Sequence, residues 1–183
     1  MAEFFFGKVL FLSNEGVGKH TFFSRYCQIE NNWIQKWYQI LKLNELVKLD
    51  GKSVNLIIHD IPIENPTSED QRFFFYHDVY GALIVYDITS SSSLNNITDW
   101  IQNIKNGEAF WRQIKGREGN IPLFLVGNKI DSKQNRSISK EEGRNLQKKH
   151  NFSYFIEVSF KTGYNVENLL NEFCCQLLNF HVR

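Results

Sequence analysis

Residues 13–21 read SNEGVGKHT, and they stand between the apolar run KVLFL at 8–12 and a segment whose apolar residues have helical spacing. The loop therefore joins the end of a predicted strand to the start of a predicted helix. In a loop of the form GxxxxGK followed by Ser or Thr, small residues let successive backbone N–H groups point at phosphate oxygens beside a helix N-terminus. The stretch predicts a phosphate-binding loop, and the alternative is an ordinary glycine-rich turn.

Two positions of the loop differ from that form. Ser13 stands where the first Gly would be, and the turn tolerates it if its backbone angles are ordinary. His20 stands where a hydroxyl would bind Mg²⁺, which prefers oxygen ligands, whereas imidazole suits softer ions. A shift of the loop that brings Thr21 to the metal is the alternative. The residues predicted to surround phosphate are Glu15, Gly16, Val17, Gly18, Lys19, His20 and Thr21.

Downstream, apolar runs bounded by turn residues alternate with helix-period segments, a pattern typical of parallel strands joined by crossover helices. The Asp50-Gly51 turn is a hairpin signal and predicts one antiparallel pair. Segments 30–38 and 61–78 have little internal pattern and lie beyond strand ends, where ligands bind in open α/β sheets. The expected strands are Lys8–Ser13, Gln39–Leu49, Ser53–Asp60, Gly81–Asp87, Leu123–Asn128 and Tyr154–Glu157, and the expected helices are Lys19–Gln28, Ser93–Ile104, Lys140–His150 and Val166–Asn179.

Length and composition indicate one domain over 1–183, because 183 residues with 42% hydrophobic content suffice for one packed core and are too few for two. The net charge of +1 comes from 21 basic and 20 acidic residues spread along the chain, so no nucleic-acid partner is expected. Three cysteines, Cys27, Cys174 and Cys175, fit a reducing cytosolic compartment, and the adjacent pair is expected to be buried thiols in a helix-like segment. The N-terminal apolar run is expected to be a core strand rather than a signal peptide.

Two polar stretches follow apolar strands in the second half of the chain: VGNKID at 126–131 and EVSFKT at 157–162. IIHDIPIE at 57–64, YGALIVYDIT at 80–89 and the LDGK turn at 49–52 add further motifs. Together with the loop at 13–21, these motifs resemble, in order and spacing, those of the Ras superfamily of small GTPases, and within it the Rab and Rab-like branch. A longer segment between Ile104 and Pro122 is the exception. NKID alone could be a polar turn without a ligand.

This resemblance implies an α/β fold of the P-loop NTPase (Ras-like) type, a three-layer sandwich with a six-stranded, mostly parallel sheet and one antiparallel edge strand. It also implies binding of GTP or GDP. An Asp131 carboxylate can accept both the ring N–H and the exocyclic amino group of guanine, a pair that adenine does not offer. The Lys129 stem can cover the base, Asn128 can brace the loop, and the Phe160 N–H can donate to the guanine carbonyl. The full guanine-binding set is Asn128, Lys129, Asp131, Ser159, Phe160 and Lys161.

The residues that would hold magnesium depart from the family pattern. His20 replaces one metal hydroxyl. Counted back from the Asp50-Gly51 turn, the first-switch Thr falls on Trp37 or Tyr38, and no Thr occurs between Thr21 and Asp60. Asp60 of the DxxG motif is kept and would act on the metal indirectly. We therefore expect Mg²⁺ binding to be weak or absent.

The residues that would sense and cleave the terminal phosphate also differ. Ile63 occupies the Gly place of DxxG, and its branched side chain denies the close backbone approach that Gly permits. Glu64 stands where the family has its catalytic Gln; it is the catalytic candidate, since a carboxylate can accept a proton from water. Glu15 would bring negative charge near the terminal phosphate, which penalises a triphosphate more than a diphosphate. The alternative is a working enzyme that has relocated its ligands.

The first-switch segment carries Trp33, Trp37 and Tyr38, and exposed rings of this kind are typical interface anchors. In the alternative, these rings fold back over the site or into the core. We expect a protein partner to bind through 30–38 and 61–78. The chain ends NFHVR without a terminal Cys, so no direct lipid anchor is expected.

The expected function is that of an atypical Rab-like small GTPase that binds guanine nucleotide with little hydrolysis and serves as a scaffold. By resemblance, it would be cytoplasmic and associated with a transport or ciliary complex. One alternative is a slow GTPase switch with rearranged metal ligands. The other is a nucleotide-free interaction protein that has kept the fold.

Overall fold

The computed structural model describes residues 4–29, 39–43, 47–49, 52–60, 75–115 and 120–181. In this part of the chain eight strands form one sheet, in the order β2-β3-β5-β1-β6-β7-β8, with β4 paired to β5. The strands are β1 (Phe4–Ser13), β2 (Cys27–Ile29), β3 (Gln39–Leu43), β4 (Val47–Leu49), β5 (Lys52–Asp60), β6 (Val79–Asp87), β7 (Leu123–Asn128) and β8 (Tyr154–Glu157). The helices are α1 (Lys19–Tyr26), α3 (Ile97–Lys115), α4 (Lys140–His150) and α5 (Val166–His181), with short 3₁₀ helices η1 (Ser91–Leu94) and η2 (Ile130–Asn135).

Within these residues five strands run parallel: β5, β1, β6, β7 and β8. On the other side of β5 the strands are short and antiparallel, because β3 and β4 pair with β5 and β2 pairs with β3. The predicted α/β class and mostly parallel sheet are confirmed. The predicted count of six strands with one antiparallel edge strand is wrong, because the described residues also form β2, which pairs with β3 and takes the edge of the sheet.

The predicted hairpin before β5 has the expected antiparallel pairing. Leu49 in β4 stands opposite Lys52 in β5, which is the register of a two-residue turn. The turn residues Asp50 and Gly51 lie outside the described residues. So do 44–46, which lie between β3 and β4.

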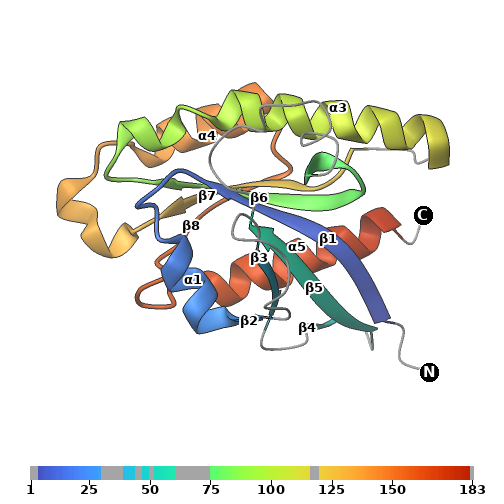
Figure 1. Cartoon of the computed structure of the whole chain (residues 1–183). Coiled ribbons are helices and arrows are strands. Elements are labelled where there is room, and N and C mark those ends of the chain that lie inside the picture. Colours follow the sequence, from blue (N-terminus) through green and yellow to red (C-terminus); the bar gives the residue numbers. More distant parts are fainter. Residues whose placement is uncertain are drawn as a thin grey trace.

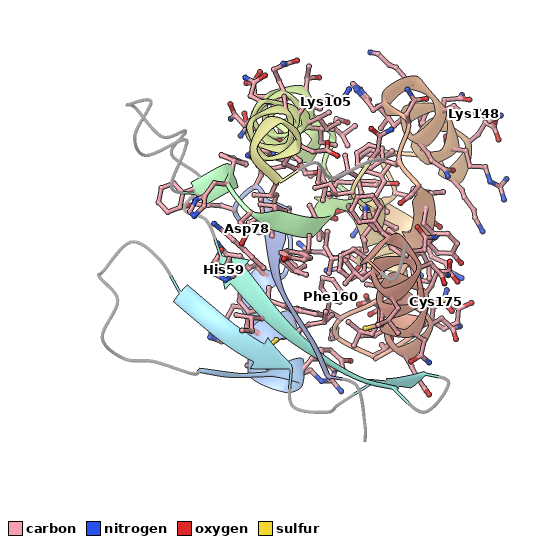
Figure 2. All side chains as sticks on the ribbon, turned by 90° about the vertical axis from the view of Figure 1, so that its right-hand side faces the viewer. His59, Asp78, Lys105, Lys148, Phe160 and Cys175 are labelled. Atoms are coloured by element: carbon pink, nitrogen blue, oxygen red, sulfur yellow. The ribbon has the colours of Figure 1, made fainter. Side chains whose placement is uncertain are left out.

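Helices cover both faces of the sheet: α1 and α5 pack on one face, and α3 and α4 on the other (Figure 1). Alternation along β1 shows why both faces need cover. Val9 and Phe11 join the cluster under α1 and α5, while Leu10 and Leu12 join the cluster under α3. Strands buried on both faces read as continuous apolar runs, as parallel strands generally do. Figure 2 shows the molecule from the right-hand side of Figure 1. Lys105 and Lys148 mark the layer of α3 and α4, and Cys175 marks α5 in the other layer.

Helix α1 is shorter than the predicted Lys19–Gln28. It ends at Tyr26 because Cys27 is extended, with φ −126° and ψ 154°, and begins β2. That strand exists through its pairing with β3, a tertiary contact that helical periodicity does not reveal. Cys27 and Cys174 are buried, and burial raises the pKa of each thiol to about 12, so both stay protonated. Cys175 is half-buried rather than buried.

The helix predicted at Ser93–Ile104 begins later and continues much further, as α3. The serine run before it forms η1, in which the Ser93 hydroxyl accepts from the Asp87 N–H at 3.0 Å and donates to the Ser90 carbonyl at 2.6 Å. Such local bonds compete with helix formation. Strand β1 begins earlier than predicted, and α5 ends later.

Helix α4 and strands β7 and β8 have the predicted bounds. The start of α4 is fixed by a capping box, in which the Ser139 hydroxyl accepts from the Glu142 N–H and the Glu142 carboxylate accepts from the Ser139 N–H. Within the described ranges, no helix combines the length and apolarity needed to cross a bilayer.

Gly107 provides a test of how closely α3 lies against the turn before β6. In an open helix, Gly→Ala stabilises by up to about 1 kcal/mol. Here, however, a Cβ on Gly107 would lie 2.3 Å from the Tyr76 carbonyl oxygen. We expect Gly107→Ala to lower the free energy of unfolding by about 1–3 kcal/mol in urea titrations, because α3 must shift. Asn106→Ala, at the exposed neighbouring position, is the control and should have little effect.

Candidate functional site

Three loops that carry the polar motifs lie at the carboxyl ends of the parallel strands β1, β6, β7 and β8 (left side of Figure 1). The loop after β1 leads into α1, the loop after β7 leads into η2, and the loop after β8 leads into α5. Parallel strands bring their carboxyl ends together, and ligands of open α/β sheets bind there. Segments distant in the sequence thus form one site.

The loop after β1 has the backbone of a phosphate-binding turn. Gly16 and Gly18 have positive φ angles of 73° and 110°, which glycine adopts without strain. Gly18 is also the N-cap of α1, so the helix begins at Lys19 with its first N–H groups at the loop. A Cβ on Gly18 would lie 2.6 Å from the Asn128 side-chain nitrogen. Ser13 is the last residue of β1 and has no positive φ, so Ser is tolerated there as predicted.

Lys19 forms an ion pair across the loop. Its ammonium donates to the Asp60 carboxylate at 2.9 Å, and Asp60 ends the neighbouring strand β5. Burial raises the pKa of the Asp60 carboxyl, while the hydrogen bond and positive charge of Lys19 act in the opposite direction. Because Lys19 has three N–H donors, it can keep this partner and still face a phosphate oxygen.

Among the residues that the structure describes, the donor set at this end of the site fits Mg²⁺ poorly. His20 presents an imidazole at the hydroxyl position and is exposed, and the Asp60 oxygen is held by Lys19. Thr21 is half-buried and lines the pocket beside Gly18. Glu15, at the outer side of the loop, is exposed.

Beside the phosphate loop lies a pocket of about 200 Å³. It is bounded by the start of α1, the loop after β7 and the loop after β8. Most of the predicted guanine-binding residues line it, and Ser159 bonds to Asp131 in its lining. The lining residues are Gly18, Thr21, Asn128, Lys129, Asp131, Ser132, Phe160 and Lys161.

Asn128 joins the three loops and is almost completely buried, at 2% exposure. Its amide nitrogen donates to the Val17 carbonyl at 2.8 Å, and its amide oxygen accepts from the Phe160 N–H at 3.0 Å. The bracing contacts expected of this side chain are therefore present. The Phe160 N–H was predicted to donate to a guanine carbonyl, and such a carbonyl would have to share it with Asn128.

Asp131 is held from one side. The Ser159 hydroxyl donates to one of its carboxylate oxygens at 2.6 Å and accepts from the Thr162 N–H at 3.1 Å. Because Ser159 is fully buried, this contact fixes the direction of an otherwise exposed carboxylate. The second oxygen of Asp131 remains available at the pocket.

The Phe160 ring explains how a large residue fits where the resemblance implies Ala. It is 1% exposed and packs 4.9 Å from the Phe22 ring and 6.2 Å from the Phe11 ring, between centroids. Figure 2 shows it in the interior of the molecule. The ring supports the floor of the pocket from the core rather than filling the pocket, and Lys161 beside it is exposed.

Sequence reasoning missed two side chains that organise the pocket. Asp87, at the end of β6, holds the Lys129 ammonium at 2.7 Å and accepts from the Thr89 N–H at 2.8 Å. This pair extends the Lys129 stem along the pocket, and the position of Asp87 after a buried strand was an available signal. Arg25 on α1 donates to the carbonyls of Phe160, at 3.0 Å, and Lys161. No spacing rule could link residues so far apart.

Several predicted residues lie outside the described part of the chain. These are the catalytic candidate Glu64, the Gly-position residue Ile63, and the whole segment 30–38. Of the segment 61–78, the structure describes 75–78, in which Phe75 is half-buried against the core.

Comparison with known proteins agrees with this architecture. The model of the Ras family matches residues 8–179. The "Ras-related protein SEC4" of Candida albicans is 27% identical over 183 residues, which cover 96% of this chain and 79% of the relative. The "Ras-related protein RABE1d" of Arabidopsis thaliana is 30% identical over 171 residues, covering 88% and 71% respectively. The "Ras-related protein Rab-26" of Drosophila melanogaster is 30% identical over 168 residues, covering 87% of this chain and 39% of the relative.

The family match spans nearly all of the described site, from the strand before the phosphate loop to the helix after the loop of Ser159. Ras-family proteins bind GTP and GDP, and the Rab-type relatives extend over most of this chain. The chain belongs to the Ras family of small GTPases, as a Rab-like member.

Proposed function

We propose that this chain is an atypical Rab-like G domain that binds GTP or GDP with little hydrolysis and acts as a protein scaffold. One contrast carries the proposal. The base side of the site is held by contacts between protein groups, with Ser159 aiming Asp131 into the pocket at 2.6 Å. On the metal side, His20 is an exposed imidazole at the hydroxyl position, and Lys19 is paired with Asp60.

Low hydrolysis follows from what phosphoryl transfer requires. The reaction depends on a cation across the phosphates, a group that positions water, and backbone close to the terminal phosphate. The sequence offers imidazole for a metal hydroxyl, Glu64 for the positioning Gln and Ile63 for the Gly of DxxG. Binding with little dependence on Mg²⁺ follows from the same substitutions. Each loss alone could be compensated, but their combination favours static binding.

The scaffold role rests on the segments 30–38 and 61–78, which we propose as the surface for a protein partner. In members that cycle, order in these segments depends on the terminal phosphate. With Ile63 at the phosphate-sensing position, a partner would meet the same surface whether or not GTP is cleaved. A cytoplasmic location in a transport or ciliary complex is part of the proposal, by analogy with Rab-like proteins.

One observation favours a second candidate, a nucleotide-free interaction protein. The Lys19–Asp60 ion pair gives the loop lysine a carboxylate partner within the protein, at 2.9 Å. A chain that never met phosphate would still favour such a partner, because a half-buried ammonium is stabilised by a neighbouring carboxylate. The two candidates differ in whether native protein carries nucleotide.

The nucleotide content of native protein separates these candidates. We expect that protein purified without added nucleotide and then denatured will release GTP or GDP at close to one molecule per chain, identified by chromatography. Released GTP would indicate static binding, and released GDP would be consistent with slow hydrolysis of GTP. Finding neither, together with a melting temperature indifferent to added GTP and GDP, would establish the nucleotide-free candidate instead.

Asp131→Asn tests the assignment of the base pocket. The Ser159 hydroxyl can donate to the new amide oxygen as it does to the carboxylate, which turns the amide nitrogen toward the base. We expect GDP affinity to fall about 10- to 100-fold, as for a lost charged hydrogen bond of about 1.5–3 kcal/mol. Xanthosine diphosphate, which offers an acceptor there, should bind better than to the unchanged protein. Asp99→Asn on α3 is the control, and unchanged GDP affinity in Asp131→Asn would refute the assignment.

His20→Ser tests the metal side. In the unchanged protein we expect GDP affinity to differ by less than about threefold between excess Mg²⁺ and EDTA, because imidazole is a poor Mg²⁺ ligand. Restoring the hydroxyl should make Mg²⁺ strengthen GDP binding by about tenfold, or about 1.4 kcal/mol. His150→Ser at the end of α4 is the control. If the unchanged protein already depends strongly on Mg²⁺ and Thr21→Ala removes that dependence, Thr21 supplies the ligand and the proposal of a lost metal site is wrong.

A further inference from the structure

Arg25 lies in the last turn of α1, the helix that begins at the phosphate loop. Its guanidinium reaches the loop after β8, where it donates to the carbonyls of Phe160, at 3.0 Å, and Lys161. Both residues line the base pocket. Arg25 thus links the helix that follows the phosphate loop to the loop that lines the base pocket.

The peptide groups of Phe160 are held from two directions. Its N–H donates inward to the Asn128 amide oxygen at 3.0 Å, and its carbonyl accepts from Arg25 on the outer side. The rest of the loop closes on Ser159, whose carbonyl accepts from the Gly163 N–H at 2.8 Å. Rotation of the Phe160–Lys161 backbone would break bonds at both ends. Its orientation therefore depends on Asn128 and Arg25 together.

Two features indicate that Arg25 serves the loop rather than the stability of the fold. Arg25 is exposed, so truncating it leaves no cavity in the core, and exposed charge contacts contribute little to stability. A guanidinium has several donors in a fixed plane, which suits it to hold two neighbouring carbonyls. The Tyr26 ring centroid lies 5.8 Å from the guanidinium carbon and helps to orient it.

We infer that Arg25 is a positioning residue for the purine base: by holding the Phe160 carbonyl on the outer side, it turns the Lys161 N–H of the same planar peptide group toward the 6-position of the bound base. The inference rests on the proposed guanine-nucleotide binding. A 6-carbonyl accepts from such N–H groups, whereas the 6-amino group of adenine cannot.

The test compares Arg25→Ala and Arg25→Lys in the full chain, with fluorescently labelled GDP as the probe. Arg25→Ala should raise the dissociation rate of labelled GDP about tenfold and lower the preference for GDP over ADP by a similar factor. Arg25→Lys should restore much of both, because an ammonium can donate to both carbonyls. Arg144→Ala, an exposed Arg of α4 away from the pocket, is the matched control and should change neither.

The melting temperature without nucleotide distinguishes positioning from a structural tie. If Arg25→Ala lowers it but leaves the GDP dissociation rate and the GDP-to-ADP preference unchanged, Arg25 is a structural tie and the inference is overturned, while the proposed function stands. If the unchanged protein binds no labelled GDP, both the inference and the proposed function fail.

Discussion

The side-chain amide of Asn128 is the contact on which the site depends. It is buried, and it bonds at one end to the phosphate loop through Val17 and at the other to the base loop through Phe160. A buried amide is costly unless both ends are satisfied, so the three loops take one relative position. Gly18 must be glycine partly for this reason, since any Cβ would displace the amide. The base side is therefore organised by the protein itself, before a ligand arrives.

The phosphate side is organised differently. Its backbone is fixed by the turn and the start of α1. Its charged side chains, however, pair with whichever opposite charge lies near them. The Lys19 ammonium lies on Asp60, the acidic residue that the family pattern places near the metal. A bound phosphate would share that ammonium, so the half-buried Asp60 carboxylate would keep only part of its compensation. This coupling makes the affinity for phosphate depend on what else neutralises Asp60.

Local signals predicted the elements that local interactions define. Helix α4 matched its expected bounds because the Ser139–Glu142 capping box fixes its start, and Asn151, in a left-handed conformation, fixes its end. Strand β2 and the end of α1 could not be predicted, because they depend on pairing with β3 rather than on periodicity. The motif residues lie together because they follow neighbouring parallel strands. Arg25 was missed because its acceptors are backbone carbonyls, which any sequence provides.

Because the base side and the phosphate side are organised differently, their residues differ in how strongly they support nucleotide binding. Asn128 and Gly18 make contacts that the fold itself needs. Packing alone therefore explains why these two residues match the family motif. A Ser or Thr hydroxyl at position 20 would bond chiefly to a bound metal ion rather than to the protein. Its replacement by the exposed His20 therefore changes the stability of the fold little. Asp131 is the informative case: it is exposed, and a charged group there is not needed to fill the core. Yet buried Ser159 bonds to it beside a pocket next to the phosphate loop, an arrangement that stability does not require and that the proposed recognition of guanine would use.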